Sequence, residues 1–97
     1  MVKPKITEKE FMAQVIQLAK LCGWMVYHTH DSRHSCAGFP DLVLLRRGVL
    51  IVAELKIGDK QPTTLQQDWL REFARANVNS FCWRPDDWPT IEAFLKG

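Results

Sequence analysis

The sequence has few cysteines and no long apolar run. Its three cysteines, Cys22, Cys36 and Cys82, are an odd number at irregular spacing, and none belongs to a CxxC motif. This usage argues against a disulfide framework and favours a reducing compartment. No uninterrupted apolar stretch approaches the roughly 20 residues that a membrane span needs. We therefore expect a cytoplasmic protein without a membrane partner.

The chain also lacks a strong excess of charge of either sign. Thirteen Lys and Arg residues stand against eleven Asp and Glu residues, which gives a formal net charge of +2. This balance is far from that of a polybasic protein, and by itself it neither indicates nor excludes a nucleic-acid partner. With 97 residues, 46% of them apolar and 25% charged, the composition is that of a soluble globule. Residues 1–97 are expected to form a single domain.

Apolar periodicity divides the chain into alternating helices and strands. Phe11, Val15 and Leu18 recur at helical spacing after Thr7 and Glu10, which have the spacing of a capping box. The full pattern predicts helices over 7–22 and 63–77, strands over 24–29, 41–46, 49–56 and 80–84, and a short last helix ending near residue 96. The order α-β-β-β-α-β-α predicts an α/β fold with one mixed sheet.

The second predicted helix has its apolar residues at helical spacing. We expect it to bury the side chains Leu65, Trp69, Phe73 and Ala76.

The strands over 41–46 and 49–56 are separated by Arg47 and Gly48, which is the layout of a tight hairpin. If the turn has two residues, the numbers of paired residues sum to 95, so Asp41 lies opposite Glu54. Lys56 lies on the same face. Two facing carboxylates are destabilising unless something neutralises them, and Mg²⁺ suits such a pair. The alternative is that Asp41 is a turn residue and that Glu54 and Lys56 are an exposed pair at a strand end.

The spacing of residues 38–41 and 54–56 matches a known sequence motif. Gly38-Phe39-Pro40-Asp41, a gap of twelve residues and then Glu54-Leu55-Lys56 resemble the PD-(D/E)XK nuclease signature. The motifs and their order on the predicted helices and strands resemble those of the VRR-Nuc (virus-type replication-repair nuclease) family over nearly the whole chain. The resemblance implies a restriction-endonuclease-like PD-(D/E)XK core.

The resemblance further implies a metal-dependent phosphodiesterase. Asp41, Glu54 and the backbone carbonyl of Leu55 would bind Mg²⁺ or Mn²⁺, and Lys56 would position the attacking water or help to deprotonate it. A further acid is expected on the first helix. Glu10 is already the capping-box partner of Thr7, so we favour Glu8, which would be catalytic and would reach the metal directly or through a water.

Gln66 has two interpretations. It has capping-box spacing from Thr63, while the resemblance makes it a catalytic amide near Lys56. Gln67 could instead take the capping role with Thr64, which would leave Gln66 free for the site. Both interpretations stay open at the level of the sequence.

The segment after the first strand carries a competing set of residues. His28, His30, His34 and Cys36 could hold Zn²⁺, although their spacing matches no common finger. The alternative is a solvated loop or one that touches phosphate. The residues expected to contact DNA are Arg33, His34, Ser35, Arg47 and Lys60.

Together these features predict a DNA endonuclease. The resemblance implies a stand-alone protein of phage or prophage type, which would act in the cytoplasm of a bacterial host. It also implies a homodimer that cleaves branched DNA such as four-way junctions, and two-fold symmetry would present two sites to two opposed strands. The alternative is a catalytically inactive DNA-binding or scaffolding module on the same fold, with structural zinc in the His/Cys loop.

Overall fold

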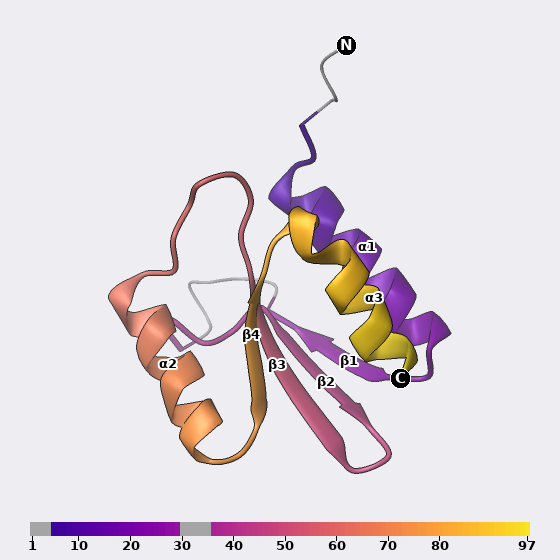
Figure 1. Ribbon diagram of the computed structural model, residues 1–97. Coiled ribbons are helices and arrows are strands. Elements are labelled where there is room, and N and C mark those ends of the chain that lie inside the picture. Colours follow the sequence, from indigo (N-terminus) through magenta and orange to yellow (C-terminus); the bar gives the residue numbers. More distant parts are fainter. Residues whose placement is uncertain (1–4, 30–35) are drawn as a thin grey trace.

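A four-stranded mixed sheet organises the chain in the computed structural model, which describes residues 5–29 and 36–97 (Figure 1). The elements are α1 (Glu8–Leu21), β1 (Met25–His28), β2 (Leu42–Arg46), β3 (Val49–Leu55), α2 (Thr64–Arg75), β4 (Asn79–Trp83), the 3-10 turn η1 (Pro85–Asp87) and α3 (Trp88–Lys96). The strands lie in the order β1-β2-β3-β4. The first three are antiparallel, and β4 runs parallel to β3. The predicted α/β class and element order are confirmed.

No helix in the described part of the chain is both long and apolar enough to cross a membrane.

The β2–β3 hairpin has the predicted register. Arg46 pairs with Val49 and Leu42 pairs with Ala53, so the numbers of paired residues sum to 95. Arg47 and Gly48 in the turn have φ angles of 50° and 78°. Positive φ at both positions is the conformation that suits the twist of a two-residue hairpin. The pairing of β2 with β3 begins at Leu42, one residue after Asp41, so Asp41 stands just outside β2.

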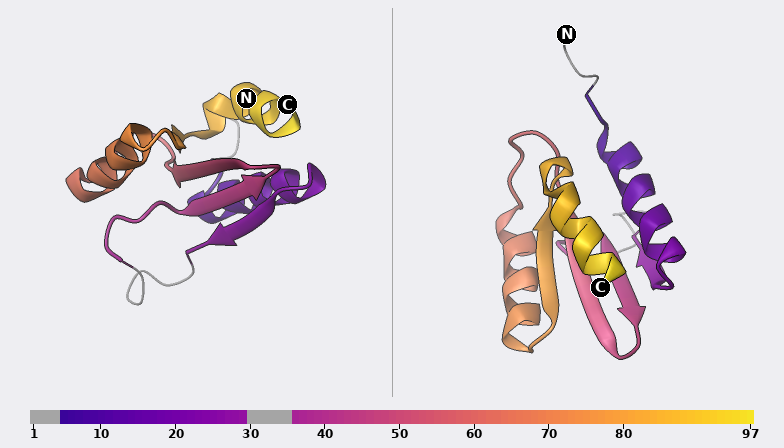
Figure 2. Two further views of the ribbon diagram at one scale, coloured as in Figure 1. Left: turned by 90° about the horizontal axis from the view of Figure 1, so that it is seen from below. Right: turned by 45° about the vertical axis from the view of Figure 1, so that its right-hand side comes forward.

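The two faces of the sheet are covered differently. Helices α1 and α3 lie side by side over one face, and α2 packs against β4 and β3 from the other (Figures 1 and 2). The face under α1 and α3 carries the core. Its buried apolar residues are Phe11, Val15, Ala19, Trp24, Leu42, Leu44, Ile51, Ala53, Leu55, Trp83, Ile91 and Leu95. The end of α3 is tied to the sheet because the Leu95 carbonyl accepts hydrogen bonds from Trp24 Nε1 (3.0 Å) and Arg46 Nη1 (2.9 Å).

The expected burial of α2 is wrong. No residue of α2 is buried, Leu65 is 46% exposed and Ala76 is an exposed C-cap. Of the four residues expected to be buried, Trp69 and Phe73 are half-buried, and both pack against Phe39. The helix packs mainly against the edge strand β4, so much of its surface stays open to solvent.

Candidate functional site

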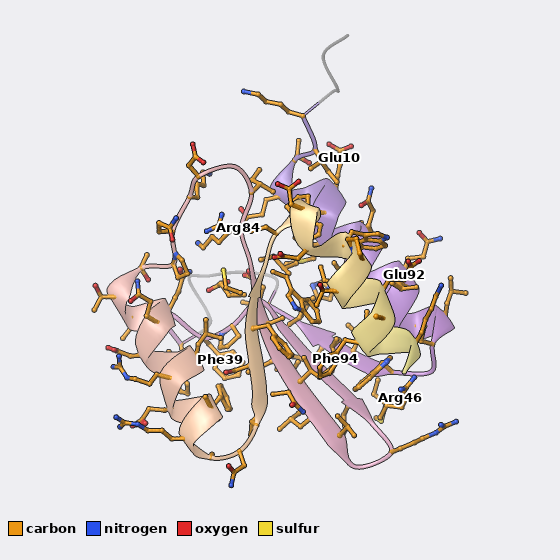
Figure 3. The ribbon with its side chains drawn as sticks, in the orientation of Figure 1. Glu10, Phe39, Arg46, Arg84, Glu92 and Phe94 are labelled. Atoms are coloured by element: carbon orange, nitrogen blue, oxygen red, sulfur yellow. The ribbon has the colours of Figure 1, made fainter. Side chains whose placement is uncertain are left out.

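The Gly38-Phe39-Pro40-Asp41 segment is held against the first half of α2. Gly38 has a φ of +81°, and a Cβ there would lie 2.7 Å from Leu65 Cγ and 2.9 Å from the Leu65 backbone carbon. Phe39 packs edge-on against Trp69, with ring centroids 5.2 Å apart, and it lies between α2 and the sheet (Figure 3). Trp69 Nε1 donates a hydrogen bond to the Ala37 carbonyl (3.1 Å). Glycine is required here because the loop and the helix approach too closely for any side chain.

Asp41 is fixed from both neighbouring strands. Its carbonyl accepts a hydrogen bond from the Thr29 N–H (3.0 Å), which continues the pairing of β1 with β2. Its Oδ2 accepts a hydrogen bond from the Leu55 N–H at the end of β3 (2.8 Å). The carboxyl group therefore lies across the end of the hairpin, within hydrogen-bonding reach of the Glu54 carboxyl group. The predicted meeting of Asp41 and Glu54 is found here.

Glu54 is buried and incompletely satisfied. Its side chain is 1% exposed, and its Oε2 has no hydrogen-bond partner among the described residues. Burial, followed by the adjacent carboxyl group of Asp41, raises the pKa of Glu54 to about 9, against an ordinary value of 4.5. An unpartnered buried oxygen of this kind costs free energy unless a cation or a proton reaches it.

Lys56 brings positive charge to the buried pair. It directly follows β3, and its backbone N–H donates to the Trp83 carbonyl on β4 (3.0 Å). The ammonium opposes the rise in the pKa of Glu54. Within residues 5–29 and 36–97 the Lys56 side chain forms no ion pair, so its charge is open to a ligand.

The two acids at the start of α1 have different surroundings. Glu10 forms the predicted capping box with Thr7: its Oε1 accepts from the Thr7 N–H and its own N–H donates to Thr7 Oγ1, both at 3.1 Å. These bonds with Thr7 lower the pKa of Glu10. Glu8 takes no part in the box, is half-buried, and lies close enough to Glu54 for its charge to raise the pKa of that residue. Glu8 is thus the acid of α1 that acts electrostatically on the buried pair.

Gln66 is the capping-box partner of Thr63, which is the N-cap of α2. Its Oε1 accepts from the Thr63 N–H (2.8 Å), and its N–H donates to Thr63 Oγ1 (3.2 Å). Gln67 does not take the capping role with Thr64, because its Nε2 donates to the Pro62 carbonyl (2.9 Å). The amide oxygen of Gln66 is therefore engaged, and only its amide nitrogen is open to a ligand.

The residues expected to contact DNA are separated in space. The turn that carries Arg47 lies at the opposite end of the hairpin from the N-terminus of α1 and the loop after β3, which includes Lys60 (Figure 1). Arg33, His34 and Ser35 lie outside the described residues.

The predicted zinc set falls partly outside the described residues as well, because it includes His30 and His34. Among the residues that are described, no three His, Cys, Asp or Glu side chains gather as a set that could hold a metal ion.

Arg84 has a role that no local pattern in the sequence indicates. Its Nη1 donates to the Gly58 carbonyl (2.9 Å) and its Nη2 to the Lys60 carbonyl (2.6 Å), so it holds the loop after β3 in place. Arg84 and this loop are 24 to 26 residues apart in sequence, and only the parallel pairing of β4 with β3 brings them together.

Two solved structures resemble the fold closely. One, named "VRR_NUC domain protein", has a TM-score of 0.73 and 16% sequence identity and covers 96% of this chain and 88% of its own. The other, named "VRR_NUC domain", has a TM-score of 0.73 and 21% identity and covers 92% of this chain and 94% of its own. No family model and no curated protein matches the chain. The chain therefore has the fold of the solved VRR_NUC domains, which confirms its resemblance to the VRR-Nuc family at the level of the fold.

Proposed function

We propose that this chain is a metal-dependent endonuclease that hydrolyses DNA phosphodiester bonds. The observation that carries the proposal is the buried Glu54, which has an unpartnered Oε2, lies beside the carboxyl group of Asp41 and is followed two residues later by Lys56. A structural role does not account for this set, because two adjacent carboxyl groups destabilise the end of a sheet. Strongly shifted pKa values with a specific charged neighbour are typical of functional sites.

The residues present fit Mg²⁺ or Mn²⁺. Mg²⁺ prefers oxygen ligands, and proteins commonly offer it one or two carboxylates while it keeps several waters. Asp41, Glu54 and the Leu55 carbonyl would hold the ion, and Glu8 would reach it directly or through a water. When bound, the ion supplies Lewis-acid polarisation of the phosphate and lowers the pKa of a bound water.

The remaining chemistry belongs to Lys56 and Gln66. The Lys56 ammonium donates hydrogen bonds to the attacking water or to a phosphate oxygen, and it stabilises the negative charge that develops there. Its backbone is fixed between β3 and β4, so the flexible stem starts from a rigid point. We expect the amide nitrogen of Gln66 to be a further donor to the substrate. Because Glu54 is buried, charges at this site act in a medium less polar than water and interact more strongly.

Asp41→Asn tests the proposal with little change in shape, because an amide oxygen can still accept the bond from the Leu55 N–H. Purified wild type is assayed with Mg²⁺ or Mn²⁺ on four-way junction, flap and linear DNA. We expect cleavage that needs the metal and that Asp41→Asn lowers by more than about a hundredfold. Unchanged melting of the variant confirms its fold. Wild type that binds DNA and never cleaves it would instead identify the inactive DNA-binding or scaffolding module.

We further propose that the chain prefers branched DNA and forms a homodimer. Met25, Tyr27 and Leu45 are 71%, 61% and 42% exposed, and they lie together on the face of β1 and β2 opposite the core. We call them the open sheet surface. Exposed apolar groups gathered in this way favour contact with another protein surface, and a second copy would place two sites about a two-fold axis.

A further inference from the structure

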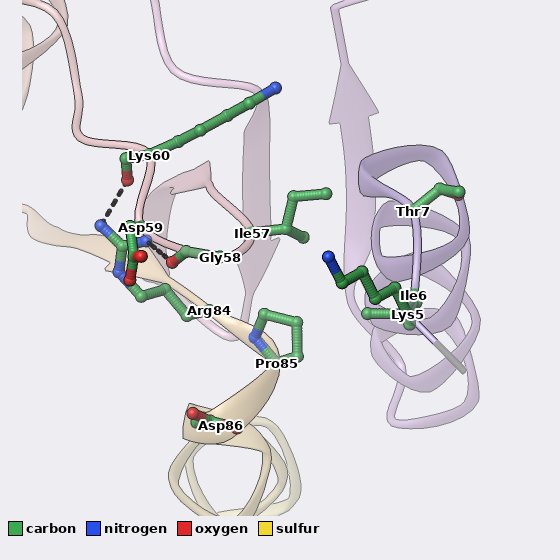
Figure 4. Close-up of a pocket in the computed structure, with 10 residues that line it drawn as sticks. All are labelled: Lys5, Ile6, Thr7, Ile57, Gly58, Asp59, Lys60, Arg84, Pro85 and Asp86. Carbon is green, nitrogen blue, oxygen red and sulfur yellow. Dashed lines mark hydrogen bonds between the residues drawn. The ribbon is translucent and has the colours of Figure 1, made fainter. Parts of the chain in front are cut away.

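A groove of about 740 Å³ lies between the segment leading into α1 and the loop that follows β3 (Figure 4). Residues 5–7 form one wall, and residues 57–60 with residues 84–86 form the other. The groove adjoins the candidate site at two points, because Thr7 precedes Glu8 and Ile57 follows Lys56. The groove therefore lies next to the candidate site along two separate segments of the chain.

The wall after β3 is held in a fixed shape. The two hydrogen bonds from Arg84 to the carbonyls of Gly58 and Lys60, dashed in Figure 4, fasten this loop to the end of β4. The Lys60 N–H also donates to the Ile57 carbonyl (3.3 Å). This wall of the groove is thus built before any ligand arrives, which lowers the cost of ordering it on binding.

The lining combines apolar walls with three cationic and two acidic side chains. Ile6 and Ile57 pack against the core from opposite walls, and Pro85 adds a third apolar group. Lys5 extends from its wall toward Ile57 and Pro85, and Lys60 extends from the opposite wall past Ile57 (Figure 4). Asp59 and Asp86 are the acidic residues of the lining. The guanidinium of Arg84 is already bonded to carbonyls, so the two lysines are the cations open to a ligand.

We propose that this groove binds an unpaired nucleotide of the DNA strand next to the scissile phosphate; this inference rests on the proposed function. Lys5 and Lys60 contact its phosphates, and the base and sugar lie against Ile6, Ile57 and Pro85. A nucleotide within a duplex has its base stacked and paired, so it offers phosphates but no apolar face. The groove also has the volume of pockets that take small organic groups, about 300–1,000 Å³. The chain therefore prefers DNA with a single-stranded region beside the cleavage site.

The test measures binding without cleavage, in EDTA, by fluorescence anisotropy. Wild type is titrated with a blunt duplex and with the same duplex carrying a short unpaired tail. We expect tighter binding to the tailed DNA and loss of that preference in Lys5→Ala/Lys60→Ala. The slope of log K against log salt for the tailed DNA should also become shallower by about 1.4, which corresponds to two lost contacts with single-strand phosphates.

Lys20→Ala/Lys96→Ala is the charge-matched control, because both lysines are exposed on helices away from the groove. This control should keep the preference. A photoreactive thymine analogue in the tail locates the strand directly, and crosslinks should fall within residues 5–7 or 57–60. Equal loss in both double variants, or crosslinks confined to the β2–β3 turn, would overturn the assignment.

The outcomes also separate this inference from the proposed function. Metal-dependent cleavage together with equal binding of blunt and tailed DNA overturns the groove and leaves the nuclease standing. A preference for tailed DNA that needs Lys5 and Lys60, in a chain that never cleaves, supports the groove and overturns the nuclease.

Discussion

Glu54 couples function to stability at the scale of single residues. Its pKa of about 9 in the folded chain lies above the ordinary value of 4.5. The native state therefore keeps a proton that the unfolded state releases between these two values. Stability from this group is fully present below pH 4.5 and is lost as the pH rises through 9.

The raised pKa of Glu54 makes the stability of the chain depend on pH. In EDTA, the free energy of unfolding of wild type should fall as the pH rises from about 5 to about 8.5. Glu54→Gln removes the titrating group but keeps the shape, so it should be more stable than wild type near pH 8 by roughly 1 to 3 kcal/mol. Urea denaturation across this range measures both values. Mg²⁺ or Mn²⁺ should stabilise wild type near pH 8 and leave the variant unchanged, and a pH-independent wild type would contradict the raised pKa of Glu54.

The two acids of α1 provide a matched pair at the same scale. Glu8→Gln and Glu10→Gln each remove one negative charge. Glutamine can still close the capping box with Thr7, so Glu10→Gln should keep both stability and cleavage. Glu8→Gln should lower the rate of metal-dependent cleavage by about tenfold or more. Single-turnover rates on one DNA substrate measure both, and equal rates for the two variants would remove Glu8 from the site.

Helix α2 positions the site at the scale of elements, although it contributes little to the core. Its first turns hold the loop that ends in Asp41, through Gly38, Phe39 and Trp69. The helix therefore acts as a support for the carboxylate. This explains how a helix with no fully buried residue is kept in place.

Gly38→Ala should disturb this support. The substitution combines a positive φ with a Cβ that approaches the backbone of Leu65, so we expect a loss of about 2 to 4 kcal/mol in the free energy of unfolding. Gly48→Ala is the control: its φ is also positive, but nothing lies within 4 Å of the new Cβ. It should cost only about 1 to 2 kcal/mol. Thermal and urea unfolding compare the two, and similar losses would mean that the contact with Leu65 is unimportant.

Local patterns in the sequence were enough to predict most of these elements. The capping residues Thr7 and Thr63 and the Arg47-Gly48 turn depend on neighbours within a few positions, so their geometry follows from spacing. The exposure of Leu65 could not be predicted in this way. It depends on α2 lying beside an edge strand, which is a long-range fact that helical periodicity does not contain.

The open sheet surface matters at the scale of the whole molecule. Met25, Tyr27 and Leu45 expose apolar area on the face opposite the core. If a second copy covers this area, wild type should sediment as a dimer and Leu45→Glu should shift it to a monomer. Leu21→Glu is the control, because Leu21 is 79% exposed at the end of α1 and lies off this surface. Sedimentation velocity distinguishes the cases, and a monomeric wild type would refute this part of the proposal.

The candidate site was predictable where a single hairpin builds it and unpredictable where distant segments meet. The pairing of Asp41 with Glu54 follows from the two-residue turn, so residue spacing alone predicts it. The groove needs Lys5, Lys60 and Arg84, which come from three separate parts of the chain. No spacing rule joins residues that meet only through a parallel crossover.

The two-residue turn also constrains how related sequences can differ in length. Asp41 and Glu54 face each other because equal numbers of residues separate each of them from the turn. A longer or shorter hairpin with the same turn keeps them opposed only if both strands change by the same number of residues. The gap between the two halves of the motif, twelve residues here, should therefore vary among relatives in steps of two. Sequence patterns used to find such relatives should allow gaps of ten or fourteen residues and exclude eleven or thirteen.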